Sequence, residues 1–261
     1  MPQFPFLCSA KVNELEKIKV GAVSYLNTKP FLYGFEHSNV KEQMDVSVDY
    51  PARVAQGLKD GTLDVALVPV AVLATLPEYH FVGDYGIACD GEVASVALFS
   101  DVPMEEIQTV LLDYQSRTSV ALARLLFQHH WKRNPVFEDA GTDFRNQIKG
   151  TTAGVVIGDR ALEQRLTSKY VYDLGTAWKE MTGLPFVFAA WVSRRRLPDE
   201  FIHAFNAACA TGMQHLEEVV KEEAYGVYDL EVYYKNNIHF LIDEAKKEGM
   251  SLFLKLLSSG V

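Results

Sequence analysis

The sequence contains few cysteines and no long apolar run. Its three cysteines, Cys8, Cys89 and Cys209, are widely separated and form no C-x-x-C pair. A disulfide framework and a zinc site are therefore disfavoured, and a reducing compartment is favoured. No stretch approaches the roughly 20 consecutive apolar residues that a membrane-spanning helix needs. We expect a cytoplasmic protein that binds no metal.

Signatures of cofactor-dependent and hydrolytic enzymes are also missing. There is no G-x-x-x-x-G-K-[ST] phosphate loop, no G-x-G-x-x-G after a strand, no G-x-S-x-G and no H-E-x-x-H. Phosphoryl transfer, nucleotide-dependent redox chemistry, serine hydrolysis and zinc proteolysis consequently have no support. We expect the protein to work without a cofactor.

Basic residues are outnumbered by acidic ones. The chain has 25 Lys and Arg against 34 Asp and Glu, which gives a formal net charge of -9. Nucleic acids and anionic membranes require clustered basic surface, so neither is an expected partner. A small molecule is expected instead, and an anionic one would need local hydrogen-bond donors to hold it. A monomer and a homodimer both remain open.

The first 17 residues do not match a secretory signal. They lack a basic amino-terminal region, and Pro2 and Pro5 interrupt their short apolar stretch. We expect residues 1–17 to form a disordered extension.

The chain does contain an alternation of short apolar runs and helix-period segments. With 48% hydrophobic residues, it can bury the core of one large or two modest domains. Strands are expected at 18–23, 45–50 and 63–70, and helices at 30–38 and 51–61. The third strand is apolar almost throughout, as in parallel sheets buried on both faces. This βαβαβ order predicts a doubly wound α/β half-domain.

A second block repeats this order in the middle of the chain. Its expected elements are strand 109–113, helix 116–133, strand 153–158, helix 159–166, helix 174–183 and strand 186–193. We expect Asp159 to cap the second helix of the block. After Arg196 we expect only helices.

Helices after the last strand indicate that the chain leaves a first lobe near Phe99 and returns to it near Ser193. The first lobe would then comprise residues 18–98 and 194–261, and the second lobe residues 99–193. Two crossover segments of this kind form a hinge. The expected fold is a two-lobed α/β clamp, with its ligand site in the cleft at the carboxyl ends of the parallel strands.

The heptapeptide SYLNTKP concentrates polar groups at one strand-to-helix turn. Ser24, Tyr25, Asn27 and Thr28 directly follow the first strand, and a helix is expected to begin at about Pro30. Capping a helix needs only one polar residue. Four polar residues within five therefore favour ligand binding, beside the free amides of the helix start.

The tetrapeptide SRTS repeats this pattern in the second lobe. Ser116 can cap the helix that follows, while Thr118, Ser119 and the first-turn amides offer donors to a carboxylate. Arg117 adds positive charge there, although it can equally face solvent.

Three further residues are predicted at the cleft, each with an alternative. Ser95 follows the glycine-bracketed segment GIACDG, and it lies either at the cleft floor or in a plain turn. Val68 and Pro69 end the third strand and form either a pocket wall or part of the core.

Several stretches, in their order along the chain, resemble the chorismate dehydratase family of the futalosine route to menaquinone. They include VGAVSYLNTKP, GTLDVALVPV, LLDYQSRTSVALARLL and DLGTAWKEMTGLPFVFAAW, and with shorter matches they extend over most of residues 18–193. The resemblance implies a type 2 periplasmic-binding-protein fold. It also implies a hydro-lyase that removes water from chorismate to give 3-[(1-carboxyvinyl)oxy]benzoate.

Two alternative functions remain open. The 1,4-dihydroxy-6-naphthoate synthase of the same pathway shares the DLG…W…TGLP stretch, but it carries a histidine where this chain has Gly158. A solute-binding protein for a small carboxylate would use the same cleft without catalysis. The chain also departs from the dehydratase pattern at Cys89, where a serine is expected, and at Tyr114 and Gln115, which replace smaller polar residues.

The resemblance implies a reaction without a strong protein base. Chorismate is a dianion, and Thr118, Ser119 and nearby amides would hold one of its carboxylates. Ser24 and Asn27 would lie over the reacting edge of the ring. Asn27 is the expected catalytic residue, and because an amide is very weakly basic, its role would be to hold the departing hydroxyl. The substrate's own enolpyruvyl carboxylate would accept the proton.

Overall fold

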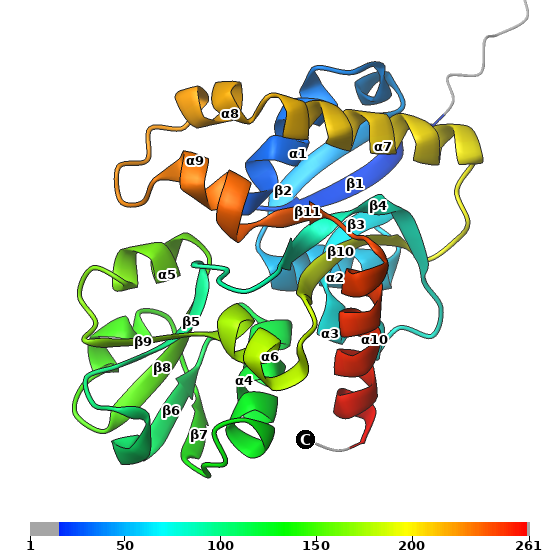
Figure 1. Ribbon diagram of the computed structural model, residues 1–261. Coiled ribbons are helices and arrows are strands. Elements are labelled where there is room, and N and C mark those ends of the chain that lie inside the picture. Colours follow the sequence, from blue (N-terminus) through cyan, green and yellow to red (C-terminus); the bar gives the residue numbers. More distant parts are fainter. Residues whose placement is uncertain (1–15, 260–261) are drawn as a thin grey trace, which may run out of the picture.

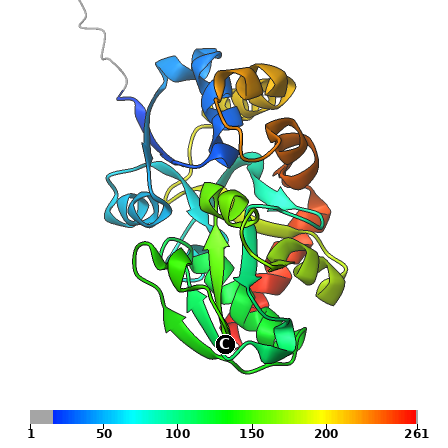
Figure 2. The same cartoon turned by 90° about the vertical axis from the view of Figure 1, so that its left-hand side faces the viewer.

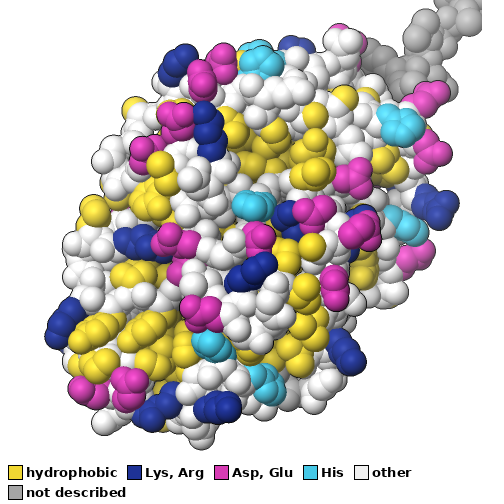
Figure 3. All heavy atoms as spheres, viewed as in Figure 1, with side chains coloured by type: hydrophobic (Ala, Val, Ile, Leu, Met, Phe, Trp, Pro, Cys, Tyr) yellow, Lys and Arg dark blue, Asp and Glu magenta, His cyan; other side chains and the backbone are white. Residues whose placement is uncertain are grey.

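The computed structural model describes residues 16–259 and divides them between two lobes, each built on its own sheet (Figure 1). Residues 1–15 of the expected N-terminal extension lie outside the described residues. Within residues 16–259, no helix is both long and apolar enough to cross a membrane. On the face that Figure 3 shows, acidic and basic side chains are interspersed.

The first lobe is built on a six-stranded sheet with the strand order β11-β4-β10-β3-β1-β2. Its strands are β1 (Ile18–Val23), β2 (Met44–Asp49), β3 (Val65–Pro69), β4 (His80–Cys89), β10 (Phe186–Ser193) and β11 (His239–Leu241). β1 pairs in parallel with β2 and β3, which confirms the predicted βαβαβ unit. β10 and β11 run antiparallel to their neighbours, so the sheet is mixed.

Helices cover this sheet on both faces (Figure 1). They are α1 (Lys29–Glu36), α2 (Pro51–Asp60), α3 (Val70–Leu73), α7 (Asp199–Gln214), α8 (Leu216–Glu222), α9 (Leu230–Val232) and α10 (Glu244–Ser258), with 3₁₀ turns at Leu26–Thr28 and Asn39–Glu42 and a π-helix at Tyr233–Asn237. α2 begins with a proline and ends at Gly61 in the left-handed conformation, as predicted. The C-terminal helix α10 extends beside the second lobe, where it contacts α4 (Figures 1 and 2).

The helices α1 and α7 pack at very short range. Gly34 of α1 and Gly212 of α7 each face the other helix, and a Cβ atom at either position would collide with the facing backbone. Trp191 of β10 packs edge-to-face against Phe31 of α1 and Phe205 of α7. These contacts fix α1, and with it the polar turn at its amino terminus.

The second lobe is built on a five-stranded sheet with the order β7-β6-β8-β5-β9. Its elements are β5 (Val96–Ser100), β6 (Thr109–Leu112), α4 (Arg117–His129), β7 (Val136–Asp139), β8 (Thr152–Ile157), α5 (Asp159–Gln164), β9 (Tyr170–Asp173) and α6 (Leu174–Thr182), with 3₁₀ turns at Met104–Glu106 and Phe144–Gln147. β6 is parallel to β7 and β8, whereas β5 is antiparallel to β8 and β9. One continuous cluster of buried side chains runs through both lobes.

The expected lobe boundaries need two corrections. β5 begins at Val96, so residues 96–98 belong to the second lobe rather than the first. β10, at residues 186–193, lies between β3 and β4 in the first sheet, so the chain returns near Gly183 and not near Ser193. An apolar strand shows neither which sheet it joins nor in which direction it runs, which is why the sequence misplaced it.

Five strands were not expected from the sequence, namely β5, β7 and β9 of the second lobe and β4 and β11 of the first. β4 is ten residues long, but Gly83 and Gly86 interrupt its apolar pattern, so the sequence shows no continuous strand signal there. β11 contradicts the expectation that only helices follow Arg196. Its three residues are too few to show an alternating pattern.

Candidate active site

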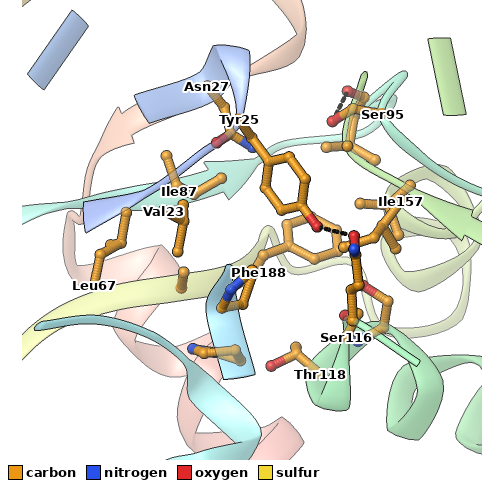
Figure 4. A pocket seen from close by; sticks show the side chains of 18 residues that line it. Val23, Tyr25, Asn27, Leu67, Ile87, Ser95, Ser116, Thr118, Ile157 and Phe188 are labelled. Atoms are coloured by element: carbon orange, nitrogen blue, oxygen red, sulfur yellow. Dashed lines mark hydrogen bonds between the residues drawn. The ribbon is translucent and has the colours of Figure 1, made fainter. Parts of the chain in front are cut away.

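A cavity lies between the two lobes and is lined by residues from both (Figure 4). Counted together with the solvent space at its open mouth, its empty volume is about 560 Å³. Much of its wall is formed by the apolar residues Val23, Leu67, Ile87, Val93, Ile157 and Phe188. Hydroxyl and amide side chains also reach it, namely Tyr25, Asn27, Ser95, Gln115, Ser116, Thr118 and Ser119.

The structure brings most of the sequence-predicted residues to this cavity. They are Tyr25, Asn27, Pro69, Ser95, Ser116, Thr118 and Ser119. Tyr25 and Asn27 come from the turn after β1, whereas Ser116 and Thr118 come from the start of α4 on the opposite wall (Figure 4). The two polar turns therefore face each other across one cavity, as predicted.

Ser24, Arg117 and Val68 do not line the cavity. Ser24 and Arg117 are exposed outside it, and Val68 is fully buried in the core. Side chains alternate between the two faces of a strand. Leu67 and Pro69 therefore face the cavity, and Val68 between them points the other way.

Thr28 is the fourth predicted residue that does not line the cavity. It is fully buried, and its hydroxyl donates a hydrogen bond to the side-chain oxygen of Asn27 at 3.3 Å. Thr28 therefore supports a cavity residue instead of reaching the ligand itself.

The polar side chains at the start of α4 also have structural partners. The Ser116 hydroxyl oxygen accepts a hydrogen bond from the backbone N–H of Ser119 at 3.0 Å, which confirms the predicted cap. The Thr118 hydroxyl oxygen accepts one from the backbone N–H of Ala71 at 3.1 Å, so its proton can be donated elsewhere. The first amides of a helix have no intrahelical acceptor. The start of α4 thus presents several neutral donors at the positive end of the helix dipole.

Tyr25 belongs to a network that the sequence did not indicate. Its hydroxyl donates to Oε1 of Gln115 at 2.6 Å, and Arg160 donates to the same oxygen at 2.7 Å. Arg160 also pairs at 2.8 Å with Asp113, whose side chain is fully buried. Burial, with the nearby Asp113 charge, raises the pKa of Tyr25, so its phenol remains a donor at neutral pH. The sequence did contain one signal for this network. Asp113 directly follows the buried strand β6, and a buried carboxylate needs a charged partner.

Asp159 joins the lobes at a second point. The prediction that it caps α5 is wrong, since Gly158 occupies the cap position. The Asp159 carboxylate instead accepts a hydrogen bond from the backbone N–H of Leu26 at 3.1 Å, and Tyr225 donates to the Asp159 carbonyl at 3.2 Å. Burial raises the pKa of the Asp159 carboxyl. The turn that carries Asn27 is thereby tied to the second lobe.

Gly158 makes room for Tyr25. It has a φ of 64°, and a Cβ atom there would lie 2.8 Å from the Tyr25 ring. Glycine is the residue that meets both demands, a left-handed φ and a close approach. Any side chain at position 158 would displace the ring from its hydrogen bond with Gln115.

The first crossover between the lobes is held by an ion pair. Ala94 has a φ of 62°, which non-glycine residues rarely adopt. Asp173 accepts hydrogen bonds from the backbone N–H groups of Val93 and Ala94 at 3.1 and 2.9 Å. Arg165 pairs with Asp173 and donates to the Ala94 carbonyl at 2.7 Å. The strained residue is thus held on both sides, and Ser95, which follows it, is fixed at the cavity wall.

The cavity is rich in donors and poor in bases. Within the described part of the chain, no Asp, Glu, Lys, Arg or His side chain lines it. Hydroxyls, side-chain amides and helix amides donate hydrogen bonds but accept protons only weakly. Such a cavity can bind an anion and exclude water, but it offers no strong protein base.

Two similar proteins carry a described activity. The chain is 28% identical to a Thermus thermophilus protein named chorismate dehydratase, in an alignment that covers 91% of this chain and 94% of the relative. It is 26% identical to a Campylobacter jejuni protein of the same name, with 90% and 95% covered.

Comparison with solved structures identifies the fold of the chain, and a match to a family model identifies its family. A solved Candida albicans protein, described as having the generic periplasmic binding protein structural fold, matches with a TM-score of 0.64 and 13% identity over 94% of this chain and 91% of that one. This similarity confirms the predicted two-lobed fold. A family model described as menaquinone biosynthesis matches residues 18–259. The chain therefore belongs to the menaquinone biosynthesis family.

Proposed function

We propose that the protein is a chorismate dehydratase, a hydro-lyase that converts chorismate to 3-[(1-carboxyvinyl)oxy]benzoate and water. Its family and the two relatives named for this activity support the assignment. The observation that carries it is the composition of the cavity, where neutral donors from both lobes face each other and no strong base lies between them. Within menaquinone biosynthesis we assign the protein to the futalosine route.

The start of α4 supplies the donors for one substrate carboxylate. Thr118, Ser119 and the first-turn amides bind it in the field of the helix dipole. Ser116 keeps its role as the cap and orders this turn. Arg117 lies outside the cavity and contributes positive charge without direct contact. These neutral donors hold an anion in a protein whose net charge is -9.

The opposite wall holds the reacting part of the ring. Tyr25, Asn27 and Ser95 supply the polar contacts there, while Pro69 and the ring of Phe188 provide apolar surface for the cyclohexadiene. Asn27 carries the catalytic role. Its amide oxygen accepts from Thr28, and its N–H groups hold the departing hydroxyl.

The elimination breaks two bonds of the substrate. The enolpyruvyl carboxylate takes the hydrogen at the ether-bearing carbon as a proton, and the electron pair of that C–H bond forms the new ring double bond. The neighbouring hydroxyl leaves and receives this proton, so water departs and both carboxylates end ionised. Donors on the ring carboxylate stabilise the charge that develops through the conjugated diene. Aromatisation drives the reaction.

Closure of the lobes protects this reaction from solvent. The Tyr25–Gln115 and Leu26–Asp159 hydrogen bonds connect the lobes beside the cavity, and a closed cleft excludes water from the reacting ring. We place the reaction in the cytoplasm and without a cofactor. The buried free thiols of Cys89 and Cys209 suit a reducing compartment.

Incubation of the purified protein with chorismate tests the assignment. We expect chorismate to disappear and an aromatic product, lighter by one water, to form in many-fold molar excess over the protein, as measured by ultraviolet absorbance and mass spectrometry. A dihydroxynaphthoate synthase would leave chorismate unchanged. A solute-binding protein would bind it without forming product. Either of these outcomes overturns the proposed function.

A further inference from the structure

Tyr233 lies behind the cavity wall, in the C-terminal segment that completes the first lobe. It is the first residue of the π-helix Tyr233–Asn237, and its side chain is completely buried. It does not line the cavity itself. Because π-helices are rare and occur frequently at functional sites, the contacts of this residue bear on the chemistry of the cavity.

The Tyr233 hydroxyl is hydrogen-bonded to one residue of the cavity wall and lies near a second. It donates a hydrogen bond to Oγ of Ser95 at 2.8 Å, across 138 positions of sequence. Burial raises the pKa of Tyr233, and the neighbouring Ser95 and Asn27 side chains partly offset that rise. One phenol hydroxyl therefore lies beside two of the side chains assigned to the substrate.

The residues around Tyr233 secure the backbone of the same region. Tyr234 donates to the carbonyl of Leu26 at 3.0 Å, and the Asn237 side chain donates to the carbonyl of Glu92 at 3.3 Å. These bonds hold the turn that carries Asn27 and the crossover that carries Ser95. Among them, the bond from Tyr233 is directed at a cavity-lining side chain.

This bond decides where the Ser95 proton can point. A serine hydroxyl has one proton and two lone pairs, and the Tyr233 phenol occupies one lone pair. The other contact of Ser95 Oγ is the Val93 carbonyl at 3.5 Å, which is too long for a strong hydrogen bond. The Ser95 proton is therefore available to a ligand in the cavity.

We propose that Tyr233 is a positioning residue for the dehydration reaction and acts through Ser95, by directing its hydroxyl proton at the bound substrate. The inference rests on the proposed function. The raised pKa keeps the phenol protonated at neutral pH, so Tyr233 orients Ser95 and does not exchange protons with the substrate. Support of this kind from behind the wall keeps a contact residue in its productive orientation.

The Tyr233→Phe variant removes the hydroxyl and retains the buried ring. We expect kcat for chorismate to fall about tenfold and KM to stay within about twofold, because Ser95 is present but misdirected. Tyr79→Phe is the control. It removes a tyrosine hydroxyl just before β4, where the ring packs against Phe81 away from the cavity, and should retain wild-type kcat. An unchanged kcat in Tyr233→Phe overturns the inference.

A double-mutant cycle with Ser95 separates positioning from general damage. If Tyr233 acts through Ser95, the double variant Tyr233→Phe/Ser95→Ala has the kcat of Ser95→Ala alone, within about twofold. If the two substitutions instead lower kcat by the product of their separate effects, the inference is overturned. The double variant lacks both the Tyr233 and the Ser95 hydroxyl, so neither is left without its partner. Its kcat can therefore be compared with that of Ser95→Ala even where Tyr233→Phe alone unfolds. Thermal unfolding of each variant checks its folding.

The wild-type protein distinguishes this inference from the function on which it rests. A wild type that leaves chorismate unchanged overturns the proposed function, and the inference with it. If the wild type is active and Tyr233→Phe has the same kcat, the inference is overturned but the proposed function stands.

Discussion

The Tyr25 hydroxyl and the side-chain oxygen of Gln115 meet at 2.6 Å and join the two lobes beside the cavity. Arg160 fixes the acceptor from its other side, and Gly158 leaves the space that the Tyr25 ring occupies. The closed arrangement of the lobes thus depends in part on one phenol hydroxyl, and this dependence can be measured.

Tyr25→Phe should weaken substrate binding. The variant keeps the ring against Gly158 but loses the bond to Gln115, which makes the closed state less favourable by about 1 kcal/mol. We expect KM for chorismate to rise about fivefold, with a smaller effect on kcat. Steady-state kinetics measures both quantities. Tyr170→Phe, in β9 of the second lobe, is the control and should keep the wild-type KM, whereas an unchanged KM in Tyr25→Phe would contradict the role in closure.

Asn27→Ala should abolish most turnover while leaving binding largely intact. The amide is assigned to the departing hydroxyl, so its loss affects the transition state more than the bound substrate. We expect kcat to fall at least about 100-fold, and product affinity, measured by calorimetry, to change less than about threefold. Asn27→Asp should also lose affinity, because it places a negative charge beside a dianion. Asn39→Ala, on an exposed turn, is the control. Normal turnover in Asn27→Ala would refute the assignment.

Asp159→Asn should stabilise the protein at neutral pH. Burial raises the pKa of Asp159 above its ordinary 3.8. The folded state therefore favours the protonated acid, and the stability from this group is present below about pH 4 and lost as pH rises through the folded-state pKa. Asparagine keeps an acceptor for the Leu26 amide without the charge. We expect a Tm about 2 °C above wild type at pH 7.

The same comparison at about pH 3, below the ordinary carboxyl pKa and further below the raised pKa of Asp159, should show almost no difference in Tm, because the carboxyl is then largely protonated. Asp139→Asn, which changes an exposed carboxylate, serves as the control at both pH values. A lower Tm for Asp159→Asn at pH 7 would show that the buried charge stabilises the fold.

Ala94→Gly should separate stability from activity. Glycine relieves the left-handed conformation of Ala94, which costs about 1 kcal/mol, so the free energy of unfolding should be unchanged or slightly higher. The crossover then becomes less rigid beside Ser95, and we expect kcat to fall about threefold or more. Urea unfolding measures the free energy of unfolding, and steady-state kinetics measures kcat. Ala207→Gly in α7 is the contrast, since it should cost about 1 kcal/mol of stability without loss of kcat. A destabilised Ala94→Gly would argue against the relief of strain.

Arg117→Glu should slow the capture of substrate without changing the chemical step. Arg117 lines a neighbouring groove with Lys59, and this groove shares Pro51, Pro69 and Gln115 with the cavity. At low ionic strength we expect kcat/KM to fall about fivefold with kcat unchanged. The difference should shrink as salt is added, because exposed charges are screened. A salt-independent loss, or a loss of kcat, would indicate direct contact with the substrate.

Much of the site was predictable because it depends on local patterns. Four polar residues at one strand-to-helix turn exceed what capping requires, and Asn27 and Tyr25 indeed line the cavity. The start of α4 followed from the same reasoning. Ser24 was misplaced because local sequence does not show which side chains of a polar turn face the cavity and which face solvent. Val68 was misplaced because a strand that is apolar on both faces does not show which of its residues face the cavity.

The remaining contacts depend on distant parts of the chain. Tyr233 reaches Ser95 across 138 positions, and Asp159 reaches Leu26 across 133. No local pattern marks such pairs, since a tyrosine within a helical stretch is equally suited to ordinary packing. The direction of β10 was hidden for a similar reason, because it depends on the strands that flank it in the sheet.

The position of β4 in the first sheet has a consequence for synthesis of the chain. β4 pairs with β10 and β11, which are both translated after every strand of the second lobe. Until β10 has been synthesised, the edges of β3 and β4 have no strand between them to pair with. All five strands of the other sheet have emerged from the ribosome before that point. Cotranslational folding therefore favours the second lobe first, and a nascent chain stays inactive until its last third has been made.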